Sequence, residues 1–255
     1  MKEYNVFYKV MDERNSRTIR LIGKDNLTKL QSAKVLIVGV GGVGSYAAEA
    51  IARAGVGTIA VMDGDQVAAS NLNRQLIALT SNIGKNKAEV MATRIKDINP
   101  DCNIITIPNF YISLNSKNIE NPSSYNSDKS DKNLRKNNNP DLSKFDWVID
   151  AIDDVDAKVE LIKNANEQGV NIISSMGTAG KLDTDFRISD ISKTSVCPLA
   201  KVIRKRLREI GIEHLAVVYS EEKANITKGE LGTISYVPAT AGLKLSEHVI
   251  KEIIK

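Results

Sequence analysis

The feature that most constrains the fold is a strand that runs directly into a glycine-rich turn and then into a helix. Residues 33–40 form a near-continuous apolar run rich in Val and Ile, typical of a strand buried on both faces of a parallel sheet. The turn holds Gly39, Gly41, Gly42 and Gly44, and residues 45–53 have apolar side chains at helical spacing. This order predicts the first unit of a nucleotide-binding α/β domain.

The alternation of strand and helix continues along the chain. Further apolar runs predict strands at 58–62, 103–107, 147–152 and 170–174. Helical spacing predicts helices at 87–98, 158–168, 199–210 and 241–254. We therefore expect one α/β domain over residues 1–255, with a Rossmann-like, doubly wound, mostly parallel sheet and helices on both faces.

Two segments stand outside this pattern. A helical N-terminal arm is expected at about residues 1–32, before the first strand. Residues 115–140 hold eight Asn, five Ser and four Lys, and very few large apolar side chains. Such a segment buries too little apolar surface to offset the entropy of ordering it. We predict that it is a flexible surface insertion.

Composition excludes several classes of protein. The net charge of +4 permits an anionic partner without requiring one. The two cysteines, Cys102 and Cys197, form no Cys-x-x-Cys pair, which excludes a thiolate zinc site and a disulfide framework. Cys102 is expected at the surface or at a strand edge. Neither a signal peptide nor an apolar run of about 20 residues that could cross a bilayer is found, so we expect a cytoplasmic protein without membrane contact.

The glycine turn predicts a phosphate site. Glycines let the backbone approach a phosphate closely, and the following helix N-terminus offers free N–H groups and the positive end of its dipole. Asp63 ends the next strand, where a carboxylate accepts hydrogen bonds from ribose hydroxyls. The same fingerprint serves NAD, FAD and ATP, so a nicotinamide-dependent oxidoreductase and a non-catalytic dinucleotide sensor are alternatives at this point.

Three further residues favour ATP. The departure of pyrophosphate from a triphosphate needs cations beyond backbone dipoles, and Arg74 and Lys87 can supply them. Asp153 follows a strand on the same rim and can hold Mg²⁺. Taken singly, each has a simpler interpretation, a solvated charge for the two cations and a helix N-cap for the carboxylate. Their combination at matched strand ends indicates an ATP site.

The motifs together resemble the ThiF/MoeB superfamily of adenylating enzymes, relatives of the ubiquitin-activating enzyme. They are GVGGVGS at 39–45, DGD at 63–65, SNLNRQ at 70–75, GKNK at 84–87, INP at 98–100 and DAID at 150–153. Within this superfamily, the chain is similar to the TcdA (CsdL) branch in three further segments, which are SSMG at 174–177, ISDISKT at 188–194 and PLAKV at 198–202. These are ATP-dependent tRNA threonylcarbamoyladenosine dehydratases. The resemblance implies adenylation of the threonylcarbamoyl carboxylate on a tRNA adenosine, followed by cyclisation with release of AMP.

The resemblance also implies a role for each motif residue. ATP is expected to be bound by Gly39, Gly41, Gly42, Gly44, Asp63, Asp65, Asn71, Arg74, Gln75 and Lys87. Asp63 is expected to hold the ribose, and Asp153 to hold Mg²⁺ beside the reacting α-phosphate. Arg74, Lys87, Asp153 and Arg17 form the implied catalytic set, with Arg17, or its competitor Arg20, reaching the site of the partner in a homodimer.

The substrate is less constrained than the nucleotide. Adenylation of the C-terminus of a ubiquitin-like or sulfur-carrier protein is the main alternative, against which the missing zinc cysteines count. The predicted helix at 199–210 carries the densest basic patch, which suits tRNA phosphates but is also typical of solvated surface. The substrate side is expected at about residues 175–255. A catalytic thiol at Cys197 is not required by this chemistry, and a sulfur-relay protein is an open second partner.

Overall fold

The computed structural model of the chain describes residues 13–113, 139–227 and 230–255. The beginning of the expected arm and nearly all of the expected insertion lie outside these residues. Within the described ranges no helix is both long enough and apolar enough to span a bilayer.

The core is a seven-stranded sheet whose spatial order is β3-β2-β1-β4-β5-β7-β6. Its strands are β1 (Lys34–Val38), β2 (Thr58–Met62), β3 (Asn103–Ile107), β4 (Trp147–Asp150), β5 (Asn171–Ser175), β6 (Phe186–Asp190) and β7 (Ala216–Ser220). All neighbours pair in parallel except β6, which runs antiparallel to β7 at one edge. A separate hairpin joins β8 (Ile226–Thr227) and β9 (Glu230–Leu231). The predicted mostly parallel α/β sheet is confirmed.

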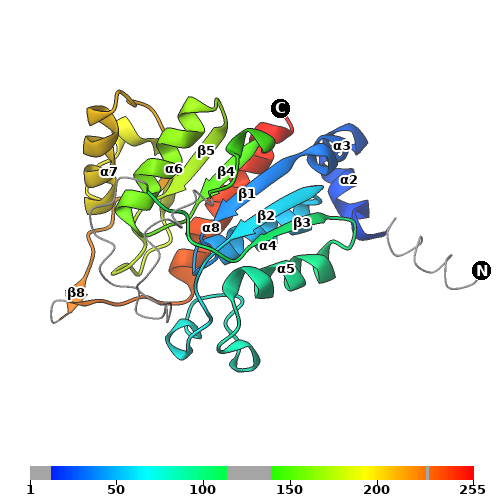
Figure 1. Ribbon diagram of the computed structural model, residues 1–255, viewed down its shortest axis with the longest axis horizontal. Helices are drawn as coiled ribbons and strands as arrows, with labels where there is room; N and C mark the ends of the chain where they lie inside the picture. The colour runs from blue at the N-terminus through cyan, green and yellow to red at the C-terminus, as the bar shows by residue number, and fades with distance from the viewer. Residues whose placement is uncertain (1–12, 114–138, 228–229) are drawn as a thin grey trace, which may run out of the picture.

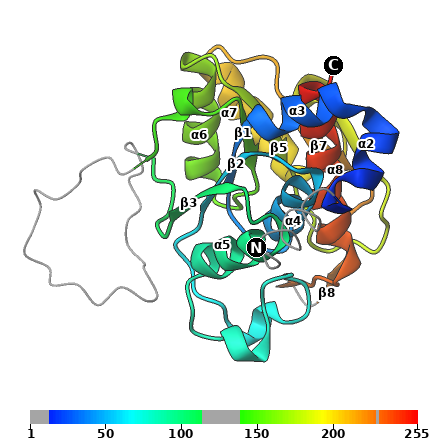
Figure 2. The ribbon, with the colours of Figure 1, turned by 90° about the vertical axis from the view of Figure 1, so that its right-hand side faces the viewer.

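Helices cover both faces of this sheet (Figures 1 and 2). The helices are α2 (Ser16–Ile22), α3 (Lys24–Ser32), α4 (Gly44–Ala54), α5 (Lys87–Ile98), α6 (Val155–Glu167), α7 (Pro198–Glu209) and α8 (Tyr236–Ile253). One face packs against α4, α5 and α8, and the other against α6 and α7. Successive side chains of β1 point to opposite faces of the sheet. Ile37 packs in the core under α4, α5 and α8, and Leu36 packs in the core under α6. A strand buried on both faces is apolar at nearly every position, and residues 35–38 of β1 are all apolar and buried, whereas Lys34 at its start is exposed.

Several boundaries differ from the sequence predictions. Helix α6 begins at Val155 because the side chain of Asp154 caps it, accepting a hydrogen bond from the Ala157 N–H at 2.7 Å. Helix α8 begins at Tyr236, five residues early, with Pro238 in its first turn where a missing N–H costs nothing. Strands β6 and β7 were not predicted.

The predicted surface position of Cys102 was wrong, whereas the strand-edge alternative fits its place directly before the edge strand β3. Cys102 is only 2% exposed, because its backbone N–H bonds to the Asn99 carbonyl and folds the thiol into the core, where cysteine behaves as a small apolar side chain. Helical spacing over residues 199–210 places Leu199, Val202, Ile203, Leu207 and Ile210 on one face, which would make that face apolar. Val202 and Ile210 are each 45% exposed, and Ile203 and Leu207 form the centre of the buried stripe.

The sheet places the predicted chemistry at one crevice. Strands β1 and β4 are parallel neighbours, but the helices that follow them, α4 and α6, pack on opposite faces. The carboxyl ends of two such strands open a crevice at the point where the strand order reverses, and ligands of open α/β sheets bind there. The glycine turn follows β1 and the 150–153 segment follows β4, so both lie at this crevice.

Asn99, from the INP motif, has a structural task far from this crevice. Its buried side-chain amide donates to the Val56 carbonyl at 3.1 Å, joining the end of α5 to the turn before β2. We predict that Asn99→Ala lowers the free energy of unfolding by about 1–3 kcal/mol, because a buried carbonyl loses its partner. Urea denaturation measures this, with the exposed Asn103→Ala as the matched control. Equal stability of the two variants would contradict the assigned role.

Candidate functional site

The glycine turn is closely packed and leaves the start of α4 open. Gly39 has φ +85°, and its N–H donates to the Met62 carbonyl at 2.8 Å. A Cβ on Gly44 would lie 1.8 Å from the Gly39 carbonyl oxygen, so only glycine fits there. No side chain caps the N-terminus of α4. The Ser45 N–H donates to the Gly41 carbonyl at 3.1 Å, and the other N–H groups of this first turn are available to an anion.

Asp63, at the end of β2, holds the glycine turn in place. One carboxylate oxygen accepts the Val40 N–H at 2.8 Å, and the other accepts the Asp65 N–H at 2.9 Å. The side chain is buried, which raises its pKa, while the nearby Lys87 charge and these two backbone hydrogen bonds act in the opposite direction. The carboxylate expected to bind ribose thus also orders the phosphate turn.

Lys87 is buried beside Asp65, two residues after Asp63. Its Nζ lies 2.8 Å from Asp65 Oδ2, and its backbone N–H donates to the Asp65 carbonyl at 2.9 Å. The residue before it, Asn86, caps α5 and donates from Nδ2 to the Asp63 carbonyl at 3.2 Å. Sequence reasoning did not single out Asn86, although an Asn directly before a helix is a known capping signal. These contacts fix the ammonium at the end of β2.

The SNLNRQ segment lies over the glycine turn. The Arg74 guanidinium donates to the Ser70 carbonyl at 3.0 Å and to Asn73 Oδ1 at 2.9 Å, and its stem lies against Gly42. Asn71 is buried, and its Oδ1 accepts a hydrogen bond from the Ala68 N–H at 3.1 Å. The segment therefore brings a guanidinium and a buried amide to the phosphate turn.

Gln75 gives direct reason to place a ligand here. Its side chain is buried, and Nε2 lies 3.6 Å from where a Cβ on Gly41 would stand. Its Oε1 has no hydrogen-bond partner among the described residues. Since buried polar atoms are nearly always paired, this oxygen fits a donor from a bound molecule. The glycine turn, the uncapped helix and this acceptor together fit a nucleotide.

Asp153 lies on the loop after β4. It is exposed and makes no hydrogen bond or ion pair with the described residues, and the helix cap is the next residue, Asp154. In the described part of the chain no group of three or more His, Cys, Asp or Glu side chains could hold a metal. A single carboxylate suits Mg²⁺ when phosphates and water supply the other ligands.

The structure does not bring Arg17 or Arg20 to these residues. Both are exposed on α2, which packs on α3 directly before β1, at the amino end of the strands (Figure 1). The five residues of β1, about 17 Å in length, separate that end from the glycine turn. Within one chain these arginines therefore lie at the opposite end of the sheet from the site.

The basic patch on α7 is partly used inside the protein. Arg204 donates to the carbonyl and hydroxyl oxygens of Thr194, and Arg206 pairs with Asp156. Lys201 and Arg208 are exposed along an open groove on the outer side of the helix, of about 760 Å³. Cys197 is the buried residue that precedes the helix, so it is not exposed for thiol chemistry.

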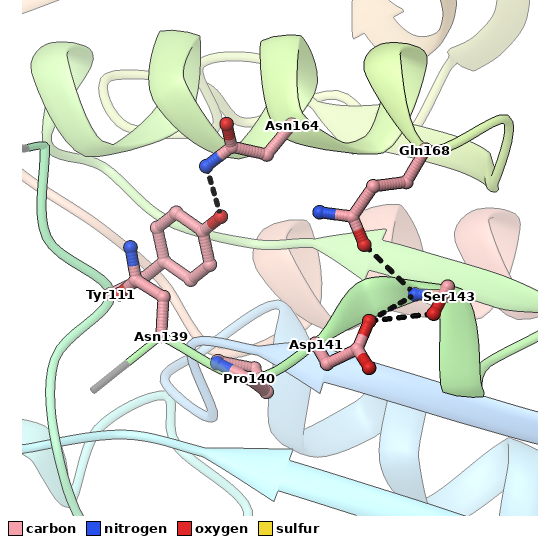
Figure 3. A pocket seen from close by; sticks show the side chains of 7 residues that line it. All are labelled: Tyr111, Asn139, Pro140, Asp141, Ser143, Asn164 and Gln168. Atoms are coloured by element: carbon pink, nitrogen blue, oxygen red, sulfur yellow. Dashed lines mark hydrogen bonds between the residues drawn. The ribbon is translucent and has the colours of Figure 1, made fainter. Parts of the chain in front are cut away.

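A second hollow, of about 470 Å³, lies apart from the crevice (Figure 3). Asn164, in the C-terminal half of α6, and Gln168, the residue directly after this helix, face Tyr111 and the segment before β4 across it. The Asn164 amide donates to the Tyr111 hydroxyl at 2.8 Å, and Gln168 accepts the Ser143 N–H at 2.9 Å. It contains no residue of the predicted site.

Comparison with known proteins gives concordant results. Residues 13–255 match the model of the ThiF family. A tRNA threonylcarbamoyladenosine dehydratase of Bacillus subtilis (strain 168) is 38% identical over 260 residues, which cover 94% of this chain and 94% of that protein. The crystal structure of the Escherichia coli enzyme TcdA in complex with ATP has a TM-score of 0.79 and 32% identity, covering 95% of this chain and 94% of that one. The structure of the same enzyme in complex with AMP gives the same values.

Two glycine variants separate the fold of the turn from its ligand. We predict that Gly44→Ala is strongly destabilised, because its Cβ would overlap the Gly39 carbonyl. Gly41→Ala should fold normally, since the atom nearest to its Cβ is Gln75 Nε2, at an ordinary contact distance of 3.6 Å. It should bind ATP at least about tenfold more weakly, because the added methyl group narrows the space for the phosphates at the glycine turn. Thermal melts and titration calorimetry with ATP measure both. Wild-type affinity in Gly41→Ala would place the phosphates elsewhere.

Proposed function

The chain belongs to the ThiF family, and we propose that it is an ATP-dependent tRNA threonylcarbamoyladenosine dehydratase. The observation that carries this is the near full-length likeness to a dehydratase of that name, over a chain whose glycine turn and buried Gln75 oxygen fit a nucleotide. The enzyme is adenylate-forming, as the motif resemblance implied. The substrate is a tRNA bearing threonylcarbamoyladenosine.

The reaction balances with ATP as co-substrate. The threonylcarbamoyl carboxylate attacks the α-phosphorus of ATP, and the bond to pyrophosphate breaks. The urea nitrogen that joins the carbamoyl carbonyl to the adenine ring then attacks the activated carbonyl carbon, loses its proton and expels AMP, which closes the five-membered hydantoin ring. The modified adenosine loses one water overall, and ATP becomes AMP and pyrophosphate.

We assign the triphosphate to the glycine turn and the start of α4, with the ribose on Asp63. Arg74 and Lys87 supply the positive charge that the leaving pyrophosphate requires. Lys87 is held in a salt bridge by Asp65, which keeps its ammonium at this rim before ATP binds. Asp153 would hold Mg²⁺, which would supply charge neutralisation at the α-phosphate.

The tRNA is assigned to the exposed cations of α7. Lys201 and Arg208 face solvent along the groove on that helix, whereas Arg204 and Arg206 are engaged within the protein. Contacts to phosphates supply sequence-independent affinity with a steep salt dependence. The sulfur-relay protein stays a prediction without an assigned surface.

The first test is conversion of the substrate itself. Incubation with ATP, Mg²⁺ and tRNA bearing threonylcarbamoyladenosine should give a nucleoside lighter by one water, seen by mass spectrometry after mild digestion and only when ATP is present. Asp153→Ala and Arg74→Ala should each lower turnover by about 100-fold or more, with unchanged melting temperature. Asp97→Ala, an exposed carboxylate at the far end of α5, is the control.

The outcomes separate the candidates. Full activity in Asp153→Ala or Arg74→Ala would refute the assigned site. Unchanged tRNA with ATP binding intact would redirect the proposal to adenylation of the C-terminus of a carrier protein. Stabilisation by NAD in place of ATP would indicate the oxidoreductase alternative.

A homodimer in which Arg17 completes the partner's site makes a distinct prediction. Arg17→Ala and Asp153→Ala should each be inactive alone, yet mixing them should restore about a quarter of wild-type turnover, because half of the dimers are mixed and each has one intact site. Repeating the mixture with Arg20→Ala identifies the acting arginine. If neither arginine variant is rescued by mixing, the cation does not come from the partner.

A further inference from the structure

A fully buried ion pair lies beneath the loop that carries Asp153. Lys158 Nζ and Asp150 Oδ2 are 2.7 Å apart, and neither side chain is exposed to solvent. Burying two charges is unfavourable unless every polar atom is bonded. The cluster belongs to no part of the reaction described above, so its place in the fold needs another reason.

The ammonium of Lys158 joins three elements. Besides Asp150, at the end of β4, it donates to Ser174 Oγ at 3.2 Å and to the Ser175 carbonyl at 3.1 Å, at the end of β5. Lys158 itself stands in the first turns of α6. The Ser174 hydroxyl donates to the same Asp150 oxygen, which closes the network. All three N–H bonds of the ammonium are therefore used at the crevice end of the sheet.

The network reaches the loop through Asp150. Its second oxygen, Oδ1, accepts the Ile152 N–H at 3.1 Å. On the opposite side, the Ala151 N–H donates to the Val38 carbonyl at 2.9 Å, and the Ala151 carbonyl lies 2.7 Å from where a Cβ on Gly39 would stand. The backbone before Asp153 is thus held between the ion pair and the glycine turn.

The position of Asp153 is set by the backbone on either side of it. Its carboxylate makes no bond with the described part of the chain, so it stands where residues 150–152, held by the ion pair, and Asp154, which caps α6, place it. Replacing a buried ion pair by apolar side chains of similar volume often leaves stability unchanged or raises it. The specific consequence of this pair is the geometry of the loop.

We propose that Lys158 is a positioning residue for the adenylation step, which fixes the Asp150–Asp153 loop against the glycine turn and the end of β5. This rests on the proposed function, because it assumes that Asp153 acts at the α-phosphate. The glycine turn, Asp63, Arg74 and Lys87, which are assigned to the ribose and the triphosphate, make no hydrogen bond with Lys158, Asp150 or Ser174. Loss of Lys158 should therefore slow turnover and leave ATP affinity nearly unchanged.

The test uses variants that avoid an unpaired buried charge. Lys158→Met alone leaves Asp150 uncompensated and is expected to fold poorly, so Asp150→Asn with Lys158→Met is the main variant, and Ser174→Ala, which keeps the ion pair, is the second. We expect kcat to fall by about 100-fold in the main variant, since misplacement of a catalytic group by about 1 Å has that effect. The Kd for ATP should change by less than about threefold. The single variant Lys158→Arg, which keeps a cation beside Asp150, should have a kcat between those of the main variant and the wild type.

Two further measurements separate positioning from general stability. Ile95→Ala, a core truncation in α5 far from the loop, is the stability control and should not lower kcat. Amide hydrogen exchange of the peptide that contains Ile152 should be faster in the main variant and in Ser174→Ala, but not in Ile95→Ala. This readout does not require the dehydratase activity.

The proposal is overturned if kcat in the folded main variant stays within about twofold of wild type, or if Ile95→Ala loses kcat to the same extent. Slow exchange at Ile152 in Ser174→Ala and in the main variant also overturns it. If the main variant does not fold, Ser174→Ala decides by the same exchange measurement. Wild-type protein that fails to convert the tRNA refutes the proposed function instead, while hydrogen exchange still decides whether Lys158 holds the loop.

Discussion

The close approach of the Gly39 carbonyl to Gly44 is the constraint on which the rest of the site depends. A Cβ at Gly44 would stand 1.8 Å from that oxygen, so the chain can turn from β1 into α4 this tightly only without a side chain. The turn is then fixed from two sides, by Asp63 at the end of β2 and by the Ala151 backbone after β4. An uncapped helix N-terminus, the feature an anion requires, is left facing the crevice.

Electrostatics divides the crevice into two parts. On the β2 side, Asp65 and Lys87 place one buried ammonium close to the glycine turn. On the β4 side, the three N–H bonds of a second buried ammonium, that of Lys158, are used by Asp150, Ser174 and Ser175. Both lysines are buried, and their hydrogen-bond partners distinguish them. We accordingly propose different tasks for them, one toward the phosphates and one toward the loop.

Sequence reasoning succeeded where a single local pattern decides the outcome. The apolar runs gave β2 and β3 with their observed bounds, and the 87–98 periodicity gave α5. The family resemblance is confirmed by the match over residues 13–255. Sequence reasoning failed where tertiary contacts decide whether a side chain is buried. A turn folds Cys102 into the core, and the packing of α7 leaves Val202 exposed. Strand β6 was missed because an edge strand with Arg187 and Asp190 lacks the apolar run that marks a buried strand.

The sequence by itself determined the α/β class, the glycine turn and the identity of the residues that gather at the crevice, because strand periodicity and glycine spacing are local properties of the chain. Only the tertiary structure decided which carboxylates are free. Asp150, Asp153 and Asp154 are near neighbours in sequence, yet the first is buried against Lys158 and the last caps α6. Of these three, Asp153 alone makes no hydrogen bond or ion pair with the described residues. The same is true of Arg17, which the fold places at the opposite end of the sheet. Such differences arise from long-range contacts between strand ends and helices, and no short stretch of sequence encodes them.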